Sequence, residues 1–224
     1  MKTILYIHGM GGGADSRIPS VLNGWFRKHR RDIRVVVRTY DFHPDRAAEQ
    51  IRAWYEELQP ALVIGESLGA NHALALQPRV PLLLVSPALN APRFLYALRV
   101  ATRIPAVHRW LNRIYKPREG KRQALDFSPE TLAAWGAYRN VADACSKTAA
   151  ATSDGAPAQV QAQEQSKPYA FFGRRDHYRR YGVVSVKKWR RTFGPGTFEI
   201  YDGTHFMEET YLRRRLIPAI LERI

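Results

Sequence analysis

The sequence predicts an α/β fold in which a mainly parallel six-stranded sheet lies between two layers of helices. Short aliphatic and β-branched runs alternate with longer amphipathic segments, which is typical of such a three-layer sandwich. At 224 residues, the chain suits one domain with a modest insertion and is short for two full domains. The expected strands are Thr3 to Ile7, Ile33 to Arg38, Leu62 to Ile64, Pro81 to Val85, Tyr169 to Phe172 and Thr197 to Tyr201.

The segments between these runs have the spacing of amphipathic helices. In the first, apolar residues recur from Ile18 to Phe26 at helical intervals, which indicates a face packed on the core. In the last, Pro218 predicts a kink or an end. The expected helices are Arg17 to His29, Asp45 to Leu58, Leu68 to Leu76, Pro129 to Lys147, Gly182 to Thr192 and Glu208 to Arg223.

The chain carries a large positive charge. Its 35 lysines and arginines against 20 acidic residues give a net charge of +15 and a pI near 10.3, which should attract anionic partners. Nucleic acid therefore stays among the conceivable partners. The arginines form short pairs and triplets, such as Arg30-Arg31 and Arg213-Arg214-Arg215, rather than one block with interleaved aromatic residues. For most of them a solvated surface is the simpler interpretation.

Cysteine content and the N-terminal sequence favour the cytoplasm. Cys145 is the only cysteine, so the chain can form no internal disulfide and no four-cysteine metal site. The chain enters a strand directly after Met1, with no apolar signal region or cleavage site. No apolar run approaches the length that spans a membrane.

Two regions interrupt the regular alternation. Residues 91 to 122 combine apolar and aromatic side chains with many arginines, after the fourth strand. An insertion there lies where open α/β sheets bind ligands, so we expect a small helical cap or flap, with an ordinary surface helix pair as the alternative. Residues 149 to 165 are rich in alanine, glutamine and serine, and predict a flexible connection.

The pentapeptide Gly65-Glu66-Ser67-Leu68-Gly69 indicates a nucleophilic serine. It directly follows an aliphatic strand and leads into a helix, and its glycines permit a sharp turn with Ser67 at the apex. This is the context of a nucleophile elbow, which raises a serine toward a base. The alternative is a plain turn between strand and helix. Glu66 receives no catalytic role and is interpreted as a surface carboxylate or one that supports a neighbour.

An activated serine needs a base to accept its proton and an acid to orient that base. His205 lies in a short polar loop between the last strand and the last helix, which is the position expected for the base. Asp176 follows the preceding strand and is our candidate acid. Asp202 is the alternative acid, although it is only three residues from His205. The alternative role for Asp176 is an ion pair with a neighbouring arginine.

Acyl transfer also needs donors for the oxyanion, which two backbone N–H groups can supply. Leu68, immediately after the serine, would be one. The loop His8-Gly9-Met10-Gly11-Gly12-Gly13 after the first strand would supply the other, from Met10, because its glycines allow close approach to the substrate. A phosphate cradle is the weaker interpretation, because the loop lacks the Gly-Lys-Ser/Thr ending and the dinucleotide fingerprint.

Taken together, these motifs resemble the α/β-hydrolase superfamily over almost the whole chain, and most closely its small, minimally capped bacterial serine esterases. The resemblance implies Ser67 as nucleophile, His205 as base and then acid, Asp176 as its orienting carboxylate, and Met10 and Leu68 as oxyanion donors. It implies no metal or organic cofactor. The chain departs from the pattern in the cationic residues around Asp176, among them Arg174 and Arg175.

The expected function is therefore hydrolysis of carboxylic esters or thioesters through an acyl-serine intermediate. Arginines of residues 91 to 122 and of the Arg174-Arg175 loop would favour anionic substrates. Two rival hypotheses remain open. One is a catalytically silent binding protein that uses its basic surface for nucleic acid or an acidic partner. The other keeps the triad and transfers the acyl group to an acceptor other than water, or cleaves a carbon–carbon bond.

Overall fold

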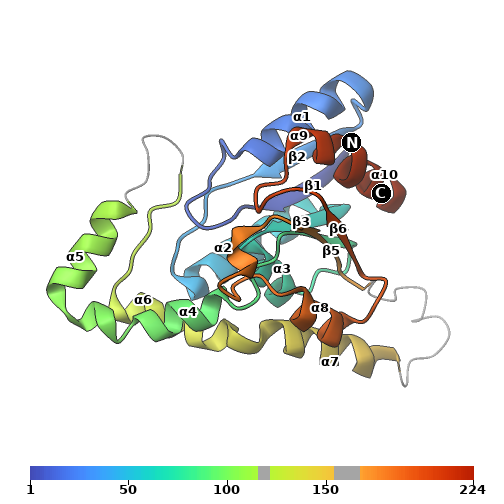
Figure 1. The fold of residues 1–224 in the computed structure, drawn as a ribbon. Coiled ribbons are helices and arrows are strands. Elements are labelled where there is room, and N and C mark those ends of the chain that lie inside the picture. Colours follow the sequence, from blue (N-terminus) through green and yellow to red (C-terminus); the bar gives the residue numbers. More distant parts are fainter. Residues whose placement is uncertain (116–121, 154–166) are drawn as a thin grey trace.

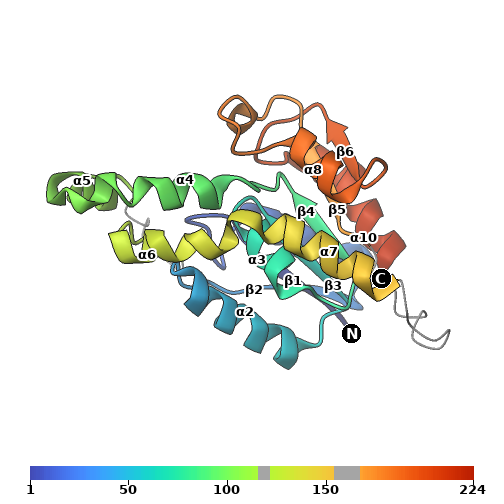
Figure 2. The same ribbon diagram turned by 90° about the horizontal axis from the view of Figure 1, so that it is seen from below.

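The computed structural model describes residues 1–115, 122–153 and 167–224. Six parallel strands form one sheet in the order β2-β1-β3-β4-β5-β6, with helices on both faces (Figures 1 and 2). The predicted fold class is thus confirmed. The strands are β1 (Lys2–Ile7), β2 (Ile33–Val37), β3 (Leu62–Glu66), β4 (Leu82–Val85), β5 (Tyr169–Gly173) and β6 (Phe198–Tyr201).

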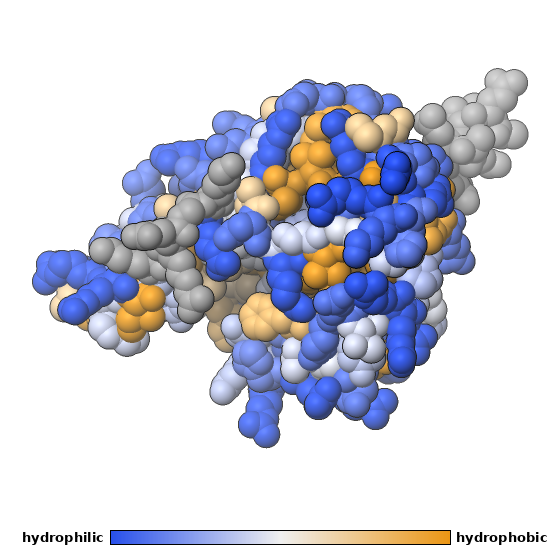
Figure 3. Space-filling view, turned by 90° about the horizontal axis from the view of Figure 1, so that it is seen from above, coloured by the Kyte–Doolittle hydropathy of each residue, from blue (hydrophilic) through white to orange (hydrophobic). Residues whose placement is uncertain are grey.

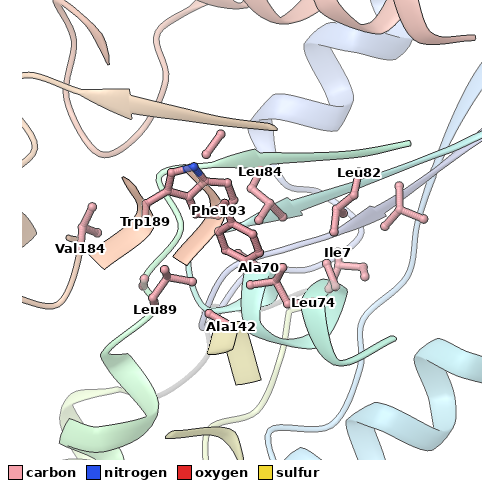
Figure 4. Close-up of a cluster of buried hydrophobic side chains, with 14 of the residues drawn as sticks. Ile7, Ala70, Leu74, Leu82, Leu84, Leu89, Ala142, Val184, Trp189 and Phe193 are labelled. Carbon is pink, nitrogen blue, oxygen red and sulfur yellow. The ribbon is translucent and has the colours of Figure 1, made fainter. Parts of the chain in front are cut away.

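Alternate residues of each strand point to opposite faces of the sheet, and this period of two creates two separate cores. On one face, Leu5 and Ile7 of β1 and Leu84 of β4 pack against α2, α3, α7 and α8 (Figure 4). On the other face, Ile4 and Tyr6 of β1 pack against α1 and the C-terminal helices. The flanking helices are α1 (Arg17–His29), α2 (Pro44–Leu58), α3 (Gly69–Leu76), α7 (Val141–Ser153), α8 (Val186–Phe193), α9 (Glu209–Tyr211) and α10 (Ile217–Arg223).

Two predicted helices are interrupted or begin later in the structure. The segment predicted as one helix from Pro129 to Lys147 consists of α6 (Pro129–Ala134), the 3-10 turn η2 (Trp135–Asn140) and α7. At Gly136 an added Cβ would lie 2.9 Å from the Tyr96 ring, so this turn is packed tightly against its neighbour. The helix predicted from Gly182 begins only at Val186, where the Ser185 hydroxyl caps the Lys188 N–H.

The last helix accommodates its proline. Pro218 lies in the first turn of α10, directly after a π turn over Leu212–Leu216. Proline has no N–H and so cannot donate the hydrogen bond of a regular helix to a carbonyl one turn earlier. The wider π turn before Pro218 accommodates this missing hydrogen bond. The kink or end predicted at Pro218 is therefore a change from a π turn to the α-helix α10. Of the connection predicted at 149 to 165, residues 149–153 belong to α7 and 154–166 lie outside the described residues.

The predicted insertion contains two helices, α4 (Ala91–Leu98) and α5 (Pro105–Ile114), joined by the 3-10 turn η1 (Ala101–Arg103). These elements extend away from the sheet as an arm beside α6 (Figure 2). Leu95 of α4 and Leu111 of α5 pack with Phe127, Leu132 and Trp135 in a third apolar cluster. Residues 116–121 of the predicted insertion lie outside the described residues.

The strand order brings the loop after β1 and the turn after β3 together at the carboxyl-terminal edge of the sheet. The connection after β1 leads to β2 on one side, whereas β3 lies on the other side of β1. Such a reversal leaves a crevice at the carboxyl ends of the strands, where open α/β sheets bind ligands. The loop after β1 and the turn after β3 meet at this crevice. No helix among the described residues is long and apolar enough to cross a bilayer.

Candidate active site

Ser67 occupies a strained turn between β3 and α3. Its φ of 50° lies in the left-handed region, which is uncommon for a residue with a side chain. Two main-chain bonds hold the turn: the Ser67 N–H donates to Val85 O at 2.9 Å, and Ala88 N–H donates to Ser67 O at 3.0 Å. The neighbouring strand β4 and the loop after it therefore hold this serine in a conformation that costs energy.

The second glycine of the pentapeptide has a steric role. An added Cβ at Gly69 would collide with the carbonyl oxygens of Ile7 and His8 at the end of β1. Only glycine allows the first turn of α3 to approach β1 so closely. The Gly-x-Ser-x-Gly pattern thus follows from packing at this position.

His205 and Asp176 lie beside Ser67, although they are far apart in the sequence. His205 Nε2 lies 2.8 Å from Ser67 Oγ, and His205 Nδ1 lies 2.7 Å from Asp176 Oδ2. The Asp176 carboxylate is buried and also accepts the Tyr178 N–H at 2.8 Å. With the Nδ1 proton on the imidazole facing Asp176, Nε2 is an acceptor for the serine hydroxyl.

The alternative acid, Asp202, is not next to this histidine. Its carboxylate is exposed and lies 3.5 Å from the Arg175 guanidinium. Arg175 also donates to the Asp202 carbonyl at 2.9 Å. The structure therefore brings together Ser67, His205 and Asp176, and separates Asp202 from them. Arg175, which the sequence placed beside the candidate acid, is instead paired with Asp202.

The glycine-rich loop after β1 reaches the serine. An added Cβ at Gly9 would lie 3.1 Å from the Ser67 Cβ, so the loop backbone approaches the nucleophile closely. Gly12 N–H donates to Gly9 O at 3.0 Å, and Gly11 N–H donates to the side chain of Gln123 at 3.0 Å. These bonds fix the loop on both sides of Met10. Within the described residues, the N–H groups of Met10 and Leu68 have no hydrogen-bond partner.

A buried carboxylate lies under the serine. Glu66 accepts a hydrogen bond from the Tyr6 hydroxyl at 2.7 Å, and burial raises the pKa of both groups. Glu66 had no predicted catalytic role, and Tyr6 was not among the predicted site residues. The alternation of strand residues contained the signal, because Glu66 follows Ile64 by two positions and so shares its buried face.

A second buried group lies on the other side of the turn. The His8 ring stacks on Tyr40 at 4.3 Å, and His72 on α3 contacts the rings of Tyr40, Trp135 and Tyr138. Burial lowers the pKa of His8 to about 4 and that of His72 to about 3. Both imidazoles are therefore neutral at pH 7. Neither ring was predicted to belong to this cluster.

A cavity of about 660 Å³ opens at Ser67 and His205. Its wall is mostly apolar, and its charged lining residues are Arg17, Glu66 and Arg122. Arg17 donates to Met207 O at 2.6 Å, and Arg122 pairs with Asp15 at 3.1 Å. The apolar part of the lining comes from the β1 loop, the arm and the loops near the histidine: Met10, Ile18, Leu68, Ala88, Ala91, Phe94, Leu95, Tyr115, Tyr178, Val183 and Phe206.

Neither Arg174 nor Arg175, two of the arginines expected to favour anionic substrates, is among the residues that line this cavity. The described residues also contain no group of three His, Cys, Asp or Glu side chains that could hold a metal ion. What the site offers chemically is a serine hydroxyl, an imidazole, a buried carboxylate and two N–H groups without a partner among the described residues, next to an apolar cavity.

Solved structures with similar folds are α/β hydrolases and esterases. A putative hydrolase of Agrobacterium vitis S4 has 14% identity and a TM-score of 0.56, and the match covers 98% of this chain and 87% of that one. The esterase Est1E of Butyrivibrio proteoclasticus, solved with ferulic acid, has 13% identity and a TM-score of 0.57, with 100% and 89% covered. An esterase of Pyrococcus furiosus has 14% identity and a TM-score of 0.51, with 99% and 78% covered.

The protein therefore has the α/β-hydrolase fold, as the sequence predicted. The model of an uncharacterised protein family, UPF0227, matches residues 3–110. This match contains the β1 loop and the serine turn, but it ends before Asp176 and His205. At these identities the similar structures establish the fold.

Proposed function

We propose that this protein is a serine hydrolase that cleaves carboxylic esters or thioesters through an acyl-serine intermediate. The observation that carries the proposal is the chain of contacts from Asp176 Oδ2 through the His205 ring to Ser67 Oγ, with separations of 2.7 and 2.8 Å. The same three roles define serine hydrolases on several unrelated folds, where they are recognised by geometry rather than by sequence position.

In the proposed mechanism, Ser67 Oγ attacks the carbonyl carbon while His205 Nε2 accepts the hydroxyl proton. Asp176 holds the Nδ1 proton and stabilises the imidazolium that forms. The N–H groups of Met10 and Leu68 donate to the oxyanion of the tetrahedral intermediate. Collapse expels an alkoxide or thiolate, which takes the proton from His205. Water then attacks the acyl-serine with His205 again as base, and the acid leaves.

The shape and charge of the cavity support an apolar group beside the reacting carbonyl. Its wall is predominantly apolar, and 660 Å³ is within the range of small-molecule pockets. We also propose a preference for substrates with negative charge, which is supported by Arg17 and Arg122 in the lining and by the net charge of +15. A pair of esters that differ in one carboxylate tests this second point, because only the anionic one should lose kcat/KM at high salt.

The first experiment is labelling of the purified protein with a fluorophosphonate, read by intact mass and peptide mapping. We expect one adduct on Ser67 that is absent in Ser67→Ala and strongly reduced in His205→Ala. Ser20→Ala is the matched control, because that serine lies on the exposed surface of α1 and should leave labelling unchanged. An unlabelled but folded wild-type protein would contradict the proposal.

Substrate assays then separate the remaining possibilities. Matched esters and thioesters should be hydrolysed in proportion to labelling, with release of one acid for each alcohol or thiol. Release of the leaving group without free acid, in the presence of an added amine or alcohol, would identify an acyltransferase instead. Salt-sensitive binding of nucleic acid that is equal in the wild type and Ser67→Ala, without turnover, would favour a binding protein.

A further inference from the structure

The arm formed by α4, η1 and α5 has an unusual composition. Residues 91–115 contain the five arginines Arg93, Arg99, Arg103, Arg109 and Arg113, and no aspartate or glutamate. The net charge of the whole protein is +15, so part of its positive charge is concentrated on this arm. Figure 2 shows α4 and α5 extending beyond the end of the sheet.

One face of α5 packs against other parts of the protein. Leu111 is buried and Val107 half-buried in the apolar cluster that contains Phe127 and Trp135. The Asn112 side chain accepts the Phe127 N–H at 3.1 Å. These contacts fix the rotation of α5 about its axis. The rest of the helix surface, which we call its outer face, therefore has a defined composition and points to solvent.

That outer face carries large apolar side chains beside arginines. Trp110 is 58% exposed and Ile114 53% exposed, and their spacing of four residues places them in one row. Arg109 and Arg113 form an adjacent row with the same spacing. Val100 and Ile104 continue the exposed apolar surface toward η1, at 58% and 57% exposure.

The arginines of this face are available for a partner. Within the described part of the chain, Arg103, Arg109 and Arg113 have no acidic side chain in ion-pair distance. Arg93 and Arg99, by contrast, lie against the protein: Arg93 donates to Asn140, and Arg99 stacks on Tyr96. At this end of the molecule, hydrophobic and hydrophilic surface lie side by side (left in Figure 3).

We propose that this outer face docks the protein onto an anionic phospholipid bilayer. A helix with arginines beside tryptophan and aliphatic side chains suits the surface of an anionic membrane. Its arginines can pair with lipid phosphates, while its apolar side chains enter the boundary between the headgroups and the acyl chains. Nucleic acid would satisfy the arginines but would leave Val100, Ile104 and Ile114 without apolar contacts. A symmetric dimer through the same face would place like charges opposite each other.

The position of the arm relates this surface to the cavity. Phe94 of α4 and Tyr115 at the end of α5 belong to the cavity lining beside Ser67. Docking would therefore place the cavity close to the lipid phase, from which a substrate with an apolar acyl group could enter. This consequence rests on the proposed hydrolase function, whereas docking itself does not.

Co-sedimentation with vesicles tests the docking. We expect the full chain to bind vesicles of phosphatidylcholine with phosphatidylglycerol, to bind pure phosphatidylcholine at least tenfold more weakly, and to dissociate at high salt. Both Trp110→Ser/Ile114→Ser and Arg109→Gln/Arg113→Gln should lower the affinity at least tenfold. The matched control is Arg190→Gln/Arg191→Gln on α8, which removes the same charge from another exposed site and should retain binding.

A second readout tests insertion directly. Lipids brominated on the acyl chain should quench the fluorescence of Trp110, and the quenching should disappear in Trp110→Phe while vesicle binding remains. Circular dichroism and thermal unfolding of each variant establish that it is folded. Ser67→Ala should bind vesicles like the wild type, so failure of docking and failure of the hydrolase proposal are distinguishable.

Several outcomes would overturn the proposal. Equal loss of binding in the α8 control would show that net charge alone attracts the protein to vesicles. If the folded wild type does not bind anionic vesicles, a membrane is not the partner of this face. A concentration-dependent dimer in light scattering, abolished by Trp110→Ser/Ile114→Ser, would identify a second copy of the chain as the occupant of this face.

Discussion

Protonation of His72 should weaken the fold as the pH falls. This imidazole lies on α3 just after Ser67, with its ring centre between 5.1 and 5.3 Å from those of Tyr40, Trp135 and Tyr138. Both ring nitrogens are buried without a hydrogen-bond partner among the described residues. Burial lowers the pKa from 6.5 to about 3, and the nearby His8 adds to the effect.

The size of the effect follows from the difference in pKa. Between pH 6.5 and pH 3 the unfolded chain holds a proton on His72 that the folded protein does not. The stability is therefore fully present above pH 6.5 and is lost as the pH falls toward 3. Each pH unit in this window costs about 1.4 kcal/mol, so at pH 5 the loss from this one residue is about 2 kcal/mol.

Replacing His72 by Phe should remove this loss. Phenylalanine keeps an aromatic ring in the cluster and has no group to protonate, so the free energies of unfolding should be similar at pH 8. At pH 5 the variant should be more stable than the wild type by about 2 kcal/mol, which in a chain of this length raises the Tm by about 4 to 8 °C. Urea unfolding at the two pH values measures the difference.

Comparing the pH dependence of the free energy of unfolding between His72→Phe and the wild type isolates the contribution of the His72 imidazole. Titration of His8 and of the buried Glu66 occurs in both proteins and largely cancels. The matched control is His29→Phe, which makes the same substitution at an exposed position of α1. If His72→Phe and the wild type lose stability equally between pH 8 and pH 5, the buried imidazole is not the source and the reasoning is wrong.

Three other changes give separate tests. Asp176→Asn should lower ester turnover by about 10⁴-fold without a change in Tm, because it disturbs the orientation of the base. Gly69→Ala should destabilise the fold by about 1 to 3 kcal/mol in urea unfolding, since the added Cβ meets carbonyl oxygens at the end of β1, whereas Gly24→Ala on α1, where space is open, should stabilise it. Tyr6→Phe should cost about 1 to 3 kcal/mol, because Glu66 loses its buried donor; a Tm equal to that of the wild type would contradict this.

Hydrophobic periodicity was sufficient to predict the sheet. All six strands lie where apolar runs were expected. The signal is clearest for the inner strands β1, β3, β4 and β5, which are buried on both faces over most of their length. Helix interruptions were harder to predict. At the break over Trp135–Asn140, Gly136 leaves no room for a Cβ beside the ring of Tyr96, and such packing between distant segments has no local pattern in the sequence.

The candidate site was predictable to the extent that it depends on strand ends. Ser67, Asp176 and His205 each follow a strand, and parallel strands bring their carboxyl ends to one edge. The sequence could not decide between Asp176 and Asp202, because both lie in loops after strands near His205. Only the folded structure shows which carboxylate faces His205 Nδ1. The aromatic cluster around His72 also combines segments far apart in the chain, so spacing could not reveal it.

Of the four non-glycine residues with positive φ in the described part of the chain, two lie at the serine turn or at the end of the neighbouring strand. Ser67 and the buried Ser86, at the end of the neighbouring strand β4, both have positive φ values, of 50° and 46°. Such conformations cost about 1 to 3 kcal/mol each and persist where the surroundings impose them. Glu66 and His72 add buried polar groups on either side of the same turn. The apolar clusters on both faces of the sheet must offset these costs, so repacking this region for stability should relax the turn and move Ser67 Oγ away from His205.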